Sequence, residues 1–225
     1  GQSEVPTRRF SLDECADVAV AVLGALGVEE PVDWVGNAWG GHVGIALGAR
    51  DPERLRTLTT IAAAVPSVTG RLRHQVHILL GAHRLLGARR FLIDQMVPTY
   101  LSPATRAVDG EAVAYLRGRI AALGRRAFHV TWTSEMLDRP DLSGHVGRLR
   151  MPTLFMTGAD DELWTPAQVR AARSDIVSAA VIDRSAHLCA LEAPGATTAA
   201  ILEHRARPGA QRAESATPSR SRSTR

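Results

Sequence analysis

The spacing of apolar residues predicts an amphipathic helix near the start of the chain. Ser11 precedes the apolar positions and Glu14 follows three residues later, which is the pattern of a capping box. Gly27 stands where the apolar pattern stops, as glycine does after many helices. The expected buried face of this helix carries Leu12, Cys15, Ala19, Leu23 and Leu26.

Short apolar runs farther along have the length and composition of strands. They occupy residues 32–35, 56–62, 152–157 and 180–182, and we expect the first to be a short buried strand. Helical spacing follows three of them, over residues 41–50, 166–176 and 194–204. This alternation is typical of the α/β class, in which helices cover both faces of a parallel sheet.

The middle of the chain, residues 65–150, has a different pattern. It shows no strand-like alternation, and its apolar spacing predicts several helices. These are expected at residues 72–86, 88–96, 111–123 and 126–137.

A glycine-rich hexapeptide, GNAWGG at residues 36–41, joins the first strand to its helix. A nucleophile elbow is a sharp strand-to-helix turn that needs small residues two before and two after its centre. Gly36 and Gly40 fill those two places, and Ala38 stands at the centre. The simpler alternative is an ordinary tight connection between a strand and a helix.

Two later strands end in groups that can carry catalysis. The run at 152–157 leads to Gly158 and the acids Asp160 and Asp161, and the run at 180–182 leads to His187. A histidine acts as a general base when a carboxylate holds its other ring nitrogen and stabilises the imidazolium. The alternatives are a turn carboxylate that caps the next helix and a histidine on a surface loop.

The order of elbow, acid and histidine, with these spacings, resembles the α/β-hydrolase fold family from residue 1 to about residue 205. Thr165-Pro166 and the run from Leu191 to Pro194 are also similar to the helix entries of that family. The resemblance implies a core at residues 1–64 and 151–204, with a helical cap inserted at residues 65–150. A basic tail follows at residues 205–225.

The same resemblance implies roles for individual residues. Asp161, ahead of Asp160, matches the acid, His187 matches the base, and Ala38 occupies the nucleophile position. Trp39 would give its backbone N–H to the oxyanion hole, with its indole near the cap. No cofactor and no metal are implied.

Two features depart from the family pattern. The Ala38 methyl group can neither attack a carbonyl carbon nor give a proton to His187. The beginning of the chain, residues 1–6, resembles the loop that follows the family's fourth strand, so we expect a truncated start. The oxyanion loop after the third strand then has no counterpart, and the strand at 32–35 has an open edge.

Three functional hypotheses follow. The first is a protein related to hydrolases of small esters, lactones or similar acyl substrates, inactive by the serine route. The second is a noncatalytic small-molecule-binding protein that keeps the capped pocket. The third is an enzyme that uses His187 and Asp161 as a base pair acting on water or on an acidic C–H of its substrate.

Composition favours one soluble globular domain, with 45% hydrophobic and 22% charged residues among 225. The net charge of +4 has a local origin, because six of the 27 basic residues, all arginine, lie in residues 205–225 against the single acid Glu214. We expect this tail to be disordered. No stretch approaches about 18 apolar residues. We therefore expect a cytoplasmic protein with a small-molecule ligand, no nucleic-acid partner and no membrane association.

The remaining candidate groups are expected to be structural. His74 and His77, with His83 nearby, fit a solvated helix face better than a metal pair. His42 is expected to pack under its helix or contact backbone. Cys15 and Cys189 are expected to be buried thiols. The aromatic residues are expected to pack in the pocket or the cap: Phe128, Trp132 and Trp164.

Overall fold

The computed structural model describes residue 4 and residues 6–207. Most of the six residues that begin the chain, and the predicted tail beyond residue 207, lie outside the described residues. The expected disorder of the tail and the expected loop at residues 1–6 are therefore not covered by the description that follows.

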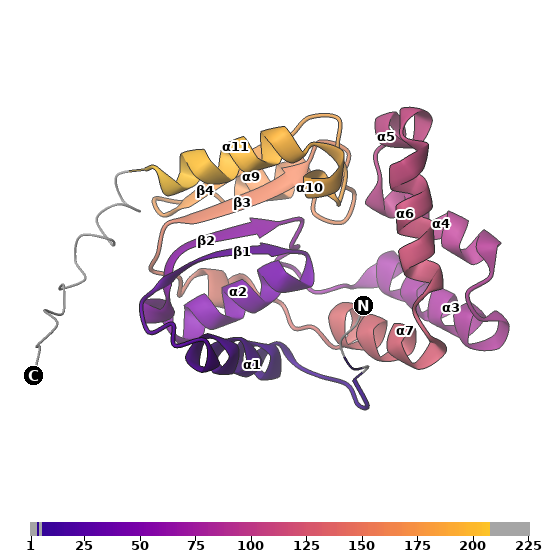
Figure 1. The fold of residues 1–225 in the computed structure, drawn as a ribbon, viewed down its shortest axis with the longest axis horizontal. Coiled ribbons are helices and arrows are strands. Elements are labelled where there is room, and N and C mark those ends of the chain that lie inside the picture. The colour runs from indigo at the N-terminus through magenta and orange to yellow at the C-terminus, as the bar shows by residue number, and fades with distance from the viewer. Residues whose placement is uncertain (1–3, 5, 208–225) are drawn as a thin grey trace, which may run out of the picture.

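In the described part of the chain, four parallel strands form a sheet in the order β1-β2-β3-β4 (Figure 1). They are β1 (Val32–Asn37), β2 (Leu55–Ile61), β3 (Thr153–Gly158) and β4 (Val177–Ile182). The register pairs Asn37 with Ile61 and Gly158 with Ile182, so the carboxyl ends of the strands meet at one edge of the sheet. The predicted strands and their parallel arrangement are confirmed.

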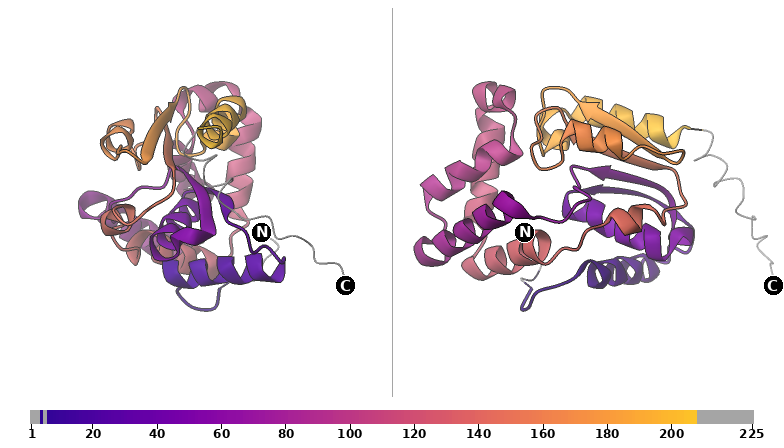
Figure 2. Two further views of the ribbon diagram at one scale, coloured as in Figure 1. Left: turned by 90° about the vertical axis from the view of Figure 1, so that its left-hand side faces the viewer. Right: turned by 180° about the vertical axis from the view of Figure 1, so that it is seen from behind.

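Helices cover both faces of this sheet, as predicted (Figures 1 and 2). Phe155 of β3 packs into the core beneath α2, whereas its neighbours Leu154 and Met156 pack into the core beneath α11. Alternate residues of one strand thus enter two different apolar layers. The first layer holds α1 (Leu12–Ala25), α2 (Trp39–Arg50), α8 (Ser143–Val146) and α9 (Pro166–Ala171), and the second holds α10 (Cys189–Glu192) and α11 (Pro194–Arg205).

A second group of helices lies beyond the carboxyl ends of the strands (Figure 1). Its own apolar core is centred on the fully buried Phe128. The group comprises α3 (Gly70–Leu86), α4 (Arg90–Tyr100), α5 (Pro103–Val108), α6 (Gly110–Ala121), α7 (Arg125–Trp132) and the π-helical turn η2 (Thr133–Leu137). The edge of the sheet where the predicted acid and histidine emerge is thereby covered by helices.

Several sequence-based boundaries are wrong. The helix expected at 88–96 continues to Tyr100 with Pro98 inside it, and the helix expected at 166–176 ends at Ala171. The helix expected at 126–137 changes to a π-helical turn after Trp132. Short helices α5, α8 and α10 and the single turn η1 (Pro52–Arg54) were not predicted, because elements of three to six residues depend on caps and tertiary packing more than on periodicity.

Two burial predictions are also wrong. Leu26, expected on the buried face of α1, is 72% exposed because it caps the end of that helix. Val35 is 49% exposed, so β1 is not the buried strand that its apolar residues indicate. The physical reason is its position, because β1 is the outermost strand of the sheet among the described residues.

This edge carries a testable consequence. Within the part of the chain that the structure describes, β1 pairs only with β2, and an unpaired strand edge is a template for pairing with another chain. We expect the 225-residue chain to self-associate at micromolar concentration in size-exclusion chromatography with light scattering. Val35→Lys, which adds a charge to the edge strand, should shift the population toward monomer.

The matched control is Val18→Lys, which places the same charge at a position that is 63% exposed on α1. It should leave self-association unchanged. A parent chain that stays monomeric at all concentrations would show that the edge of β1 is covered in solution.

Candidate functional site

Ala38 lies at the sharp turn between β1 and α2. Its backbone has φ 45° and ψ −112°, a conformation that a residue with a β-carbon rarely adopts. Its N–H donates to the carbonyl oxygen of Ile61 at 2.7 Å, which fixes the turn against β2. The turn therefore has strained geometry at the position that the sequence identifies as its centre.

The two glycines that flank this centre are not equivalent. A β-carbon at Gly36 would lie 2.2 Å from the carbonyl carbon and oxygen of Gly40, a distance that no side chain tolerates. A β-carbon at Gly40 would meet nothing within 4 Å. The prediction that both places need small side chains is thus correct for Gly36 and wrong for Gly40, whose backbone, not its missing side chain, makes the close approach.

Trp39 is the first residue of α2, so its backbone N–H lies in the first turn of the helix. The first N–H groups of a helix have no acceptor within it and carry the positive end of the helix dipole. The indole of Trp39 donates to the Cys15 sulfur at 3.4 Å and meets Phe10 edge to face, with 5.6 Å between ring centroids. Trp39 lines the cavity described below.

Asp161 and His187 are brought together, with 3.2 Å between Asp161 Oδ2 and His187 Nδ1. Asp161 is 2% exposed and His187 is 7% exposed. Nδ1–H donates to the carboxylate in this arrangement, which leaves Nε2 as the ring nitrogen that can accept a proton. Asp160, the alternative acid, is exposed to solvent.

Further hydrogen bonds hold the Asp161 carboxylate in place. Its Oδ2 accepts from the Thr157 hydroxyl at 3.0 Å, and its Oδ1 accepts the backbone N–H groups of Leu163 and Trp164 at 2.8 and 3.2 Å. A carboxylate with this many donors has a fixed orientation. The histidine ring is therefore oriented by a group that cannot itself rotate freely.

The loop that carries His187 approaches the acid turn closely. A β-carbon at Gly158 would lie 2.2 Å from the carbonyl oxygen of Ser185 and 2.3 Å from that of Ala186, so only glycine permits this contact. Glu192 holds the loop from the other side. Its carboxylate accepts the N–H groups of Ala186 and Ser102, both at 2.7 Å, and so joins the histidine loop to the start of α5.

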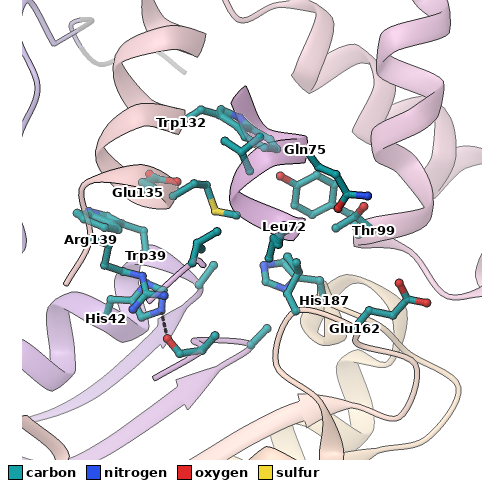
Figure 3. Close-up of a pocket in the computed structure, with 18 of the residues that line it drawn as sticks. Trp39, His42, Leu72, Gln75, Thr99, Trp132, Glu135, Arg139, Glu162 and His187 are labelled. Carbon is teal, nitrogen blue, oxygen red and sulfur yellow. Dashed lines mark hydrogen bonds between the residues drawn. The ribbon is translucent and has the colours of Figure 1, made fainter. Parts of the chain in front are cut away.

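A cavity of about 860 Å³ lies between the edge of the sheet and the helical segment (Figure 3). Ala38 and His187 both line it from the sheet side. Most of its wall is apolar, which suits a small organic ligand. The lining from the helical segment includes Leu72, Gln75, Val76, Leu79, Met96, Thr99, Tyr100, Trp132, Glu135, Met136 and Arg139.

Two basic groups on this wall are already engaged with backbone. Burial, with the nearby Arg139, lowers the pKa of His42 to about 3, and its Nε2–H donates to the Ala64 carbonyl at 3.0 Å. His42 is thus neutral and contacts backbone, as predicted. Burial lowers the pKa of Arg139 to about 10, and its guanidinium donates to the carbonyl oxygens of Val65, Pro66 and Pro140.

The sequence did not indicate two residues on the wall. The Tyr100 and His187 rings meet edge to face, with 5.6 Å between ring centroids, and burial raises the pKa of the Tyr100 phenol. Glu135 lines the cavity from η2, and burial raises the pKa of its carboxyl to about 7. Neither residue belongs to a motif, and no spacing in the sequence marks either of them as part of a cavity wall.

The other candidates from the sequence lie elsewhere. His74 and His77 are exposed on α3, and His83 is buried and stacks on Phe128 at 3.9 Å. Trp164 packs edge to face against Phe155. Cys15 is half-buried, and Cys189 is fully buried.

Two kinds of feature are absent from the described residues. No cluster of three or more His, Cys, Asp or Glu side chains there could hold a metal ion. No helix in the same part of the chain is long and apolar enough to span a membrane.

Solved structures with similar folds include esterases, a lactonase and other hydrolases. An esterase from Thermogutta terrifontis is 22% identical and matches with a TM-score of 0.81 over 90% of this chain and 75% of its own. The enol-lactonase from Burkholderia xenovorans LB400 is 18% identical and matches with a TM-score of 0.80 over 92% of this chain and 77% of its own.

A sequence match adds a local likeness. The 2-hydroxymuconate semialdehyde hydrolase of Pseudomonas sp. (strain CF600) is 43% identical over 65 residues. These residues are 28% of this chain and 23% of that hydrolase, so the match spans about a quarter of each protein. No protein-family model matches the sequence.

Proposed function

Because the chain has the α/β-hydrolase fold, we propose that it is a hydrolase-related protein that binds small esters, lactones or similar acyl compounds and does not turn them over by the serine route. The observation that carries this proposal is that Ala38, at the strained turn, lines the same cavity as His187, which is bonded to Asp161. The base and its carboxylate are in place, and the nucleophile position holds a methyl group.

The proposal assigns each group a role. Asp161 orients the His187 ring and stabilises its protonated form, and His187 Nε2 is the proton acceptor in the cavity. The Trp39 N–H donates to the carbonyl oxygen of the bound acyl compound. We assign residues 1–64 and 151–204 to the core, of which the structure describes residue 4 and residues 6–64 and 151–204, and residues 65–150 to the cap that covers the cavity.

The alanine decides the chemistry. In a serine triad, loss of the serine alone lowers turnover on the order of a millionfold, because no acyl-enzyme forms. Ala38 has no atom that can form a bond to the acyl carbon. The remaining polar groups can still position a carbonyl compound, so binding without acyl transfer is the expected behaviour.

Ligand binding can be tested with paired substitutions on α3. Leu72 lines the cavity and Leu85 is 79% exposed on the same helix. Phenyl acetate is expected to bind the parent chain saturably and to release phenol no faster than it does in buffer. Leu72→Trp, which fills the cavity, should weaken binding at least tenfold, as measured by NMR line broadening, while Leu85→Trp should not change it.

Equal affinity in the two variants would place the bound ester outside the cavity and would contradict the proposal. Circular dichroism and thermal melting of both variants show whether the fold is retained. Because the two substitutions are chemically identical and lie on one helix, a difference between them reports the cavity.

A second function is favoured by the intact hydrogen-bond network of the acid and the base. In this function His187, oriented by Asp161, activates a bound water: Nε2 takes a proton from the water as its oxygen attacks the acyl carbon. The acyl C–O bond of the ester then breaks, and the protonated His187 returns the proton to the leaving alkoxide, which gives the free acid and the alcohol. This candidate predicts turnover that does not depend on residue 38 and that is lost in His187→Ala. Kinetics of the parent chain and of this variant decide between the two functions.

A further inference from the structure

The Glu135 carboxyl group has no partner inside the cavity. Within residues 6–207 it makes no hydrogen bond and no ion pair, and only burial acts on its ionisation. Figure 3 shows it on the wall formed by the α7–η2 segment, next to Trp132 and across the cavity from His187. The side chain is half-buried, and a carboxylate on the wall of a mostly apolar cavity, without a partner among the described residues, is a group that a cationic ligand can satisfy.

Aromatic rings line the same cavity as this carboxyl group. Trp39, Tyr100 and Trp132 all belong to its wall. Burial and the Glu135 carboxylate together raise the pKa of Tyr100, so the charge of Glu135 reaches the tyrosine that contacts His187. Aromatic faces and a carboxylate are the groups that bind an organic ammonium ion.

Other charged or titratable groups around Glu135 do not already satisfy it. Arg139 donates to three carbonyl oxygens, and Arg73 of α3 donates to the Leu137 carbonyl at 2.7 Å. His42 is neutral and engaged with Ala64. Cys15 of α1 and His187 also face this region. The pKa of the Cys15 thiol is raised mainly by burial and also by the charge of Glu135.

We propose that Glu135 is a specificity-determining residue that binds a protonated amine, so that the cavity selects small acyl compounds bearing a basic nitrogen. The acyl part of this inference rests on the proposed function, whereas the amine preference does not. The ammonium group would donate to the Glu135 carboxylate and lie against the aromatic rings, with the acyl end directed toward Ala38 and His187.

Three probes of one shape test the inference on the full chain. Benzylamine is a cation at neutral pH, benzyl alcohol is neutral, and benzoate is an anion. At pH 8 we expect benzylamine to bind at least tenfold more tightly than benzyl alcohol, measured by tryptophan fluorescence and confirmed by calorimetry. Benzoate should bind more weakly than either.

Substitutions then assign the preference to one carboxyl group. Glu135→Gln keeps the size of the side chain and removes its charge, so benzylamine should bind no better than benzyl alcohol. Glu162→Gln is the matched control, because Glu162 also borders the cavity but its side chain is exposed to solvent. It should change the affinity for benzylamine less than twofold.

The pH dependence gives an independent readout. Benzylamine stays protonated between pH 6 and 8, whereas the Glu135 carboxyl, with a pKa of about 7, gains its charge in this range. Benzylamine affinity should therefore rise about tenfold from pH 6 to 8 in the parent chain and lose that rise in Glu135→Gln. A tenfold rise that persists in Glu135→Gln would contradict the role of this carboxyl group.

The outcomes separate the two proposals. Equal affinity for benzylamine and benzyl alcohol, or a preference that survives in Glu135→Gln, would overturn the amine inference and leave the acyl-binding function standing. Binding of none of the three probes would overturn the amine inference, whereas the acyl-binding function is decided separately by phenyl acetate. A preference lost in Glu162→Gln and kept in Glu135→Gln would assign the amine to the rim of the cavity and refute the role of Glu135.

Discussion

Ala38→Ser is expected to create hydrolysis of p-nitrophenyl acetate, at least a thousandfold faster than the parent chain. The strained turn already points residue 38 into the cavity that His187 lines, and Asp161 already holds the ring nitrogen that faces away from it. A serine hydroxyl there would give its proton to His187 Nε2 and attack the acyl carbon, with the Trp39 N–H stabilising the oxyanion. Release of p-nitrophenol is followed by absorbance, with an initial burst if the acyl-enzyme accumulates.

The controls for this gain use the same cavity. Ala62→Ser adds a hydroxyl at another residue with positive φ, 52°, that also lines the cavity, and it should gain nothing. Ala38→Ser combined with His187→Ala should return to the parent rate. A folded Ala38→Ser protein without a rate increase would contradict the assignment of residue 38 to the nucleophile position.

Gly36→Ala is expected to destabilise the protein by about 3 kcal/mol or more, whereas Gly40→Ala should be neutral or stabilising by up to about 1 kcal/mol. The added methyl group at Gly36 would lie 2.2 Å from the backbone of Gly40, so the turn has to move. At Gly40 the same methyl group meets open space, and alanine is favoured over glycine within a helix.

Urea unfolding of the two variants and the parent measures both changes. The two substitutions are identical and lie four residues apart, so a general sensitivity of the turn to alanine would affect them equally. Similar destabilisation at both positions would indicate such a general sensitivity and would contradict the assignment of the effect to the close approach at Gly36.

The fold was predictable because its signals are local and redundant. The Ser11–Glu14 capping box, for example, is present in the structure, with 2.8 Å between the Ser11 nitrogen and the Glu14 carboxylate. The alternation of strands and helices likewise confirms the α/β class and the parallel sheet. Local spacing did not indicate the exposure of Val35, because an apolar run does not show how many neighbours its strand has, and only the family resemblance pointed to an open edge there.

Some residues of the candidate site could be predicted from the sequence and others could not. Asp161 and His187 could be proposed from the sequence because each follows a core strand, and parallel strands deliver their carboxyl ends to one edge of a sheet. Glu135 could not be proposed from the sequence, because its position on the cavity wall depends on a π-helical turn and on the packing of α7 against α3. The orientation of a helix that covers a sheet is set by tertiary contacts and leaves little trace in periodicity.

The pairing of β2 with β3 has a consequence for how this molecule folds. Leu58 lies beside Thr153 in the sheet, although the whole helical segment separates them along the chain. Loop-closure entropy makes such a contact slow to form, and contacts of this length raise the contact order of the protein. During synthesis β1 and β2 emerge well before their neighbour β3. The β2 edge that pairs with β3 therefore stays unpaired, with apolar surface exposed, and chaperone binding and aggregation compete with folding at that stage.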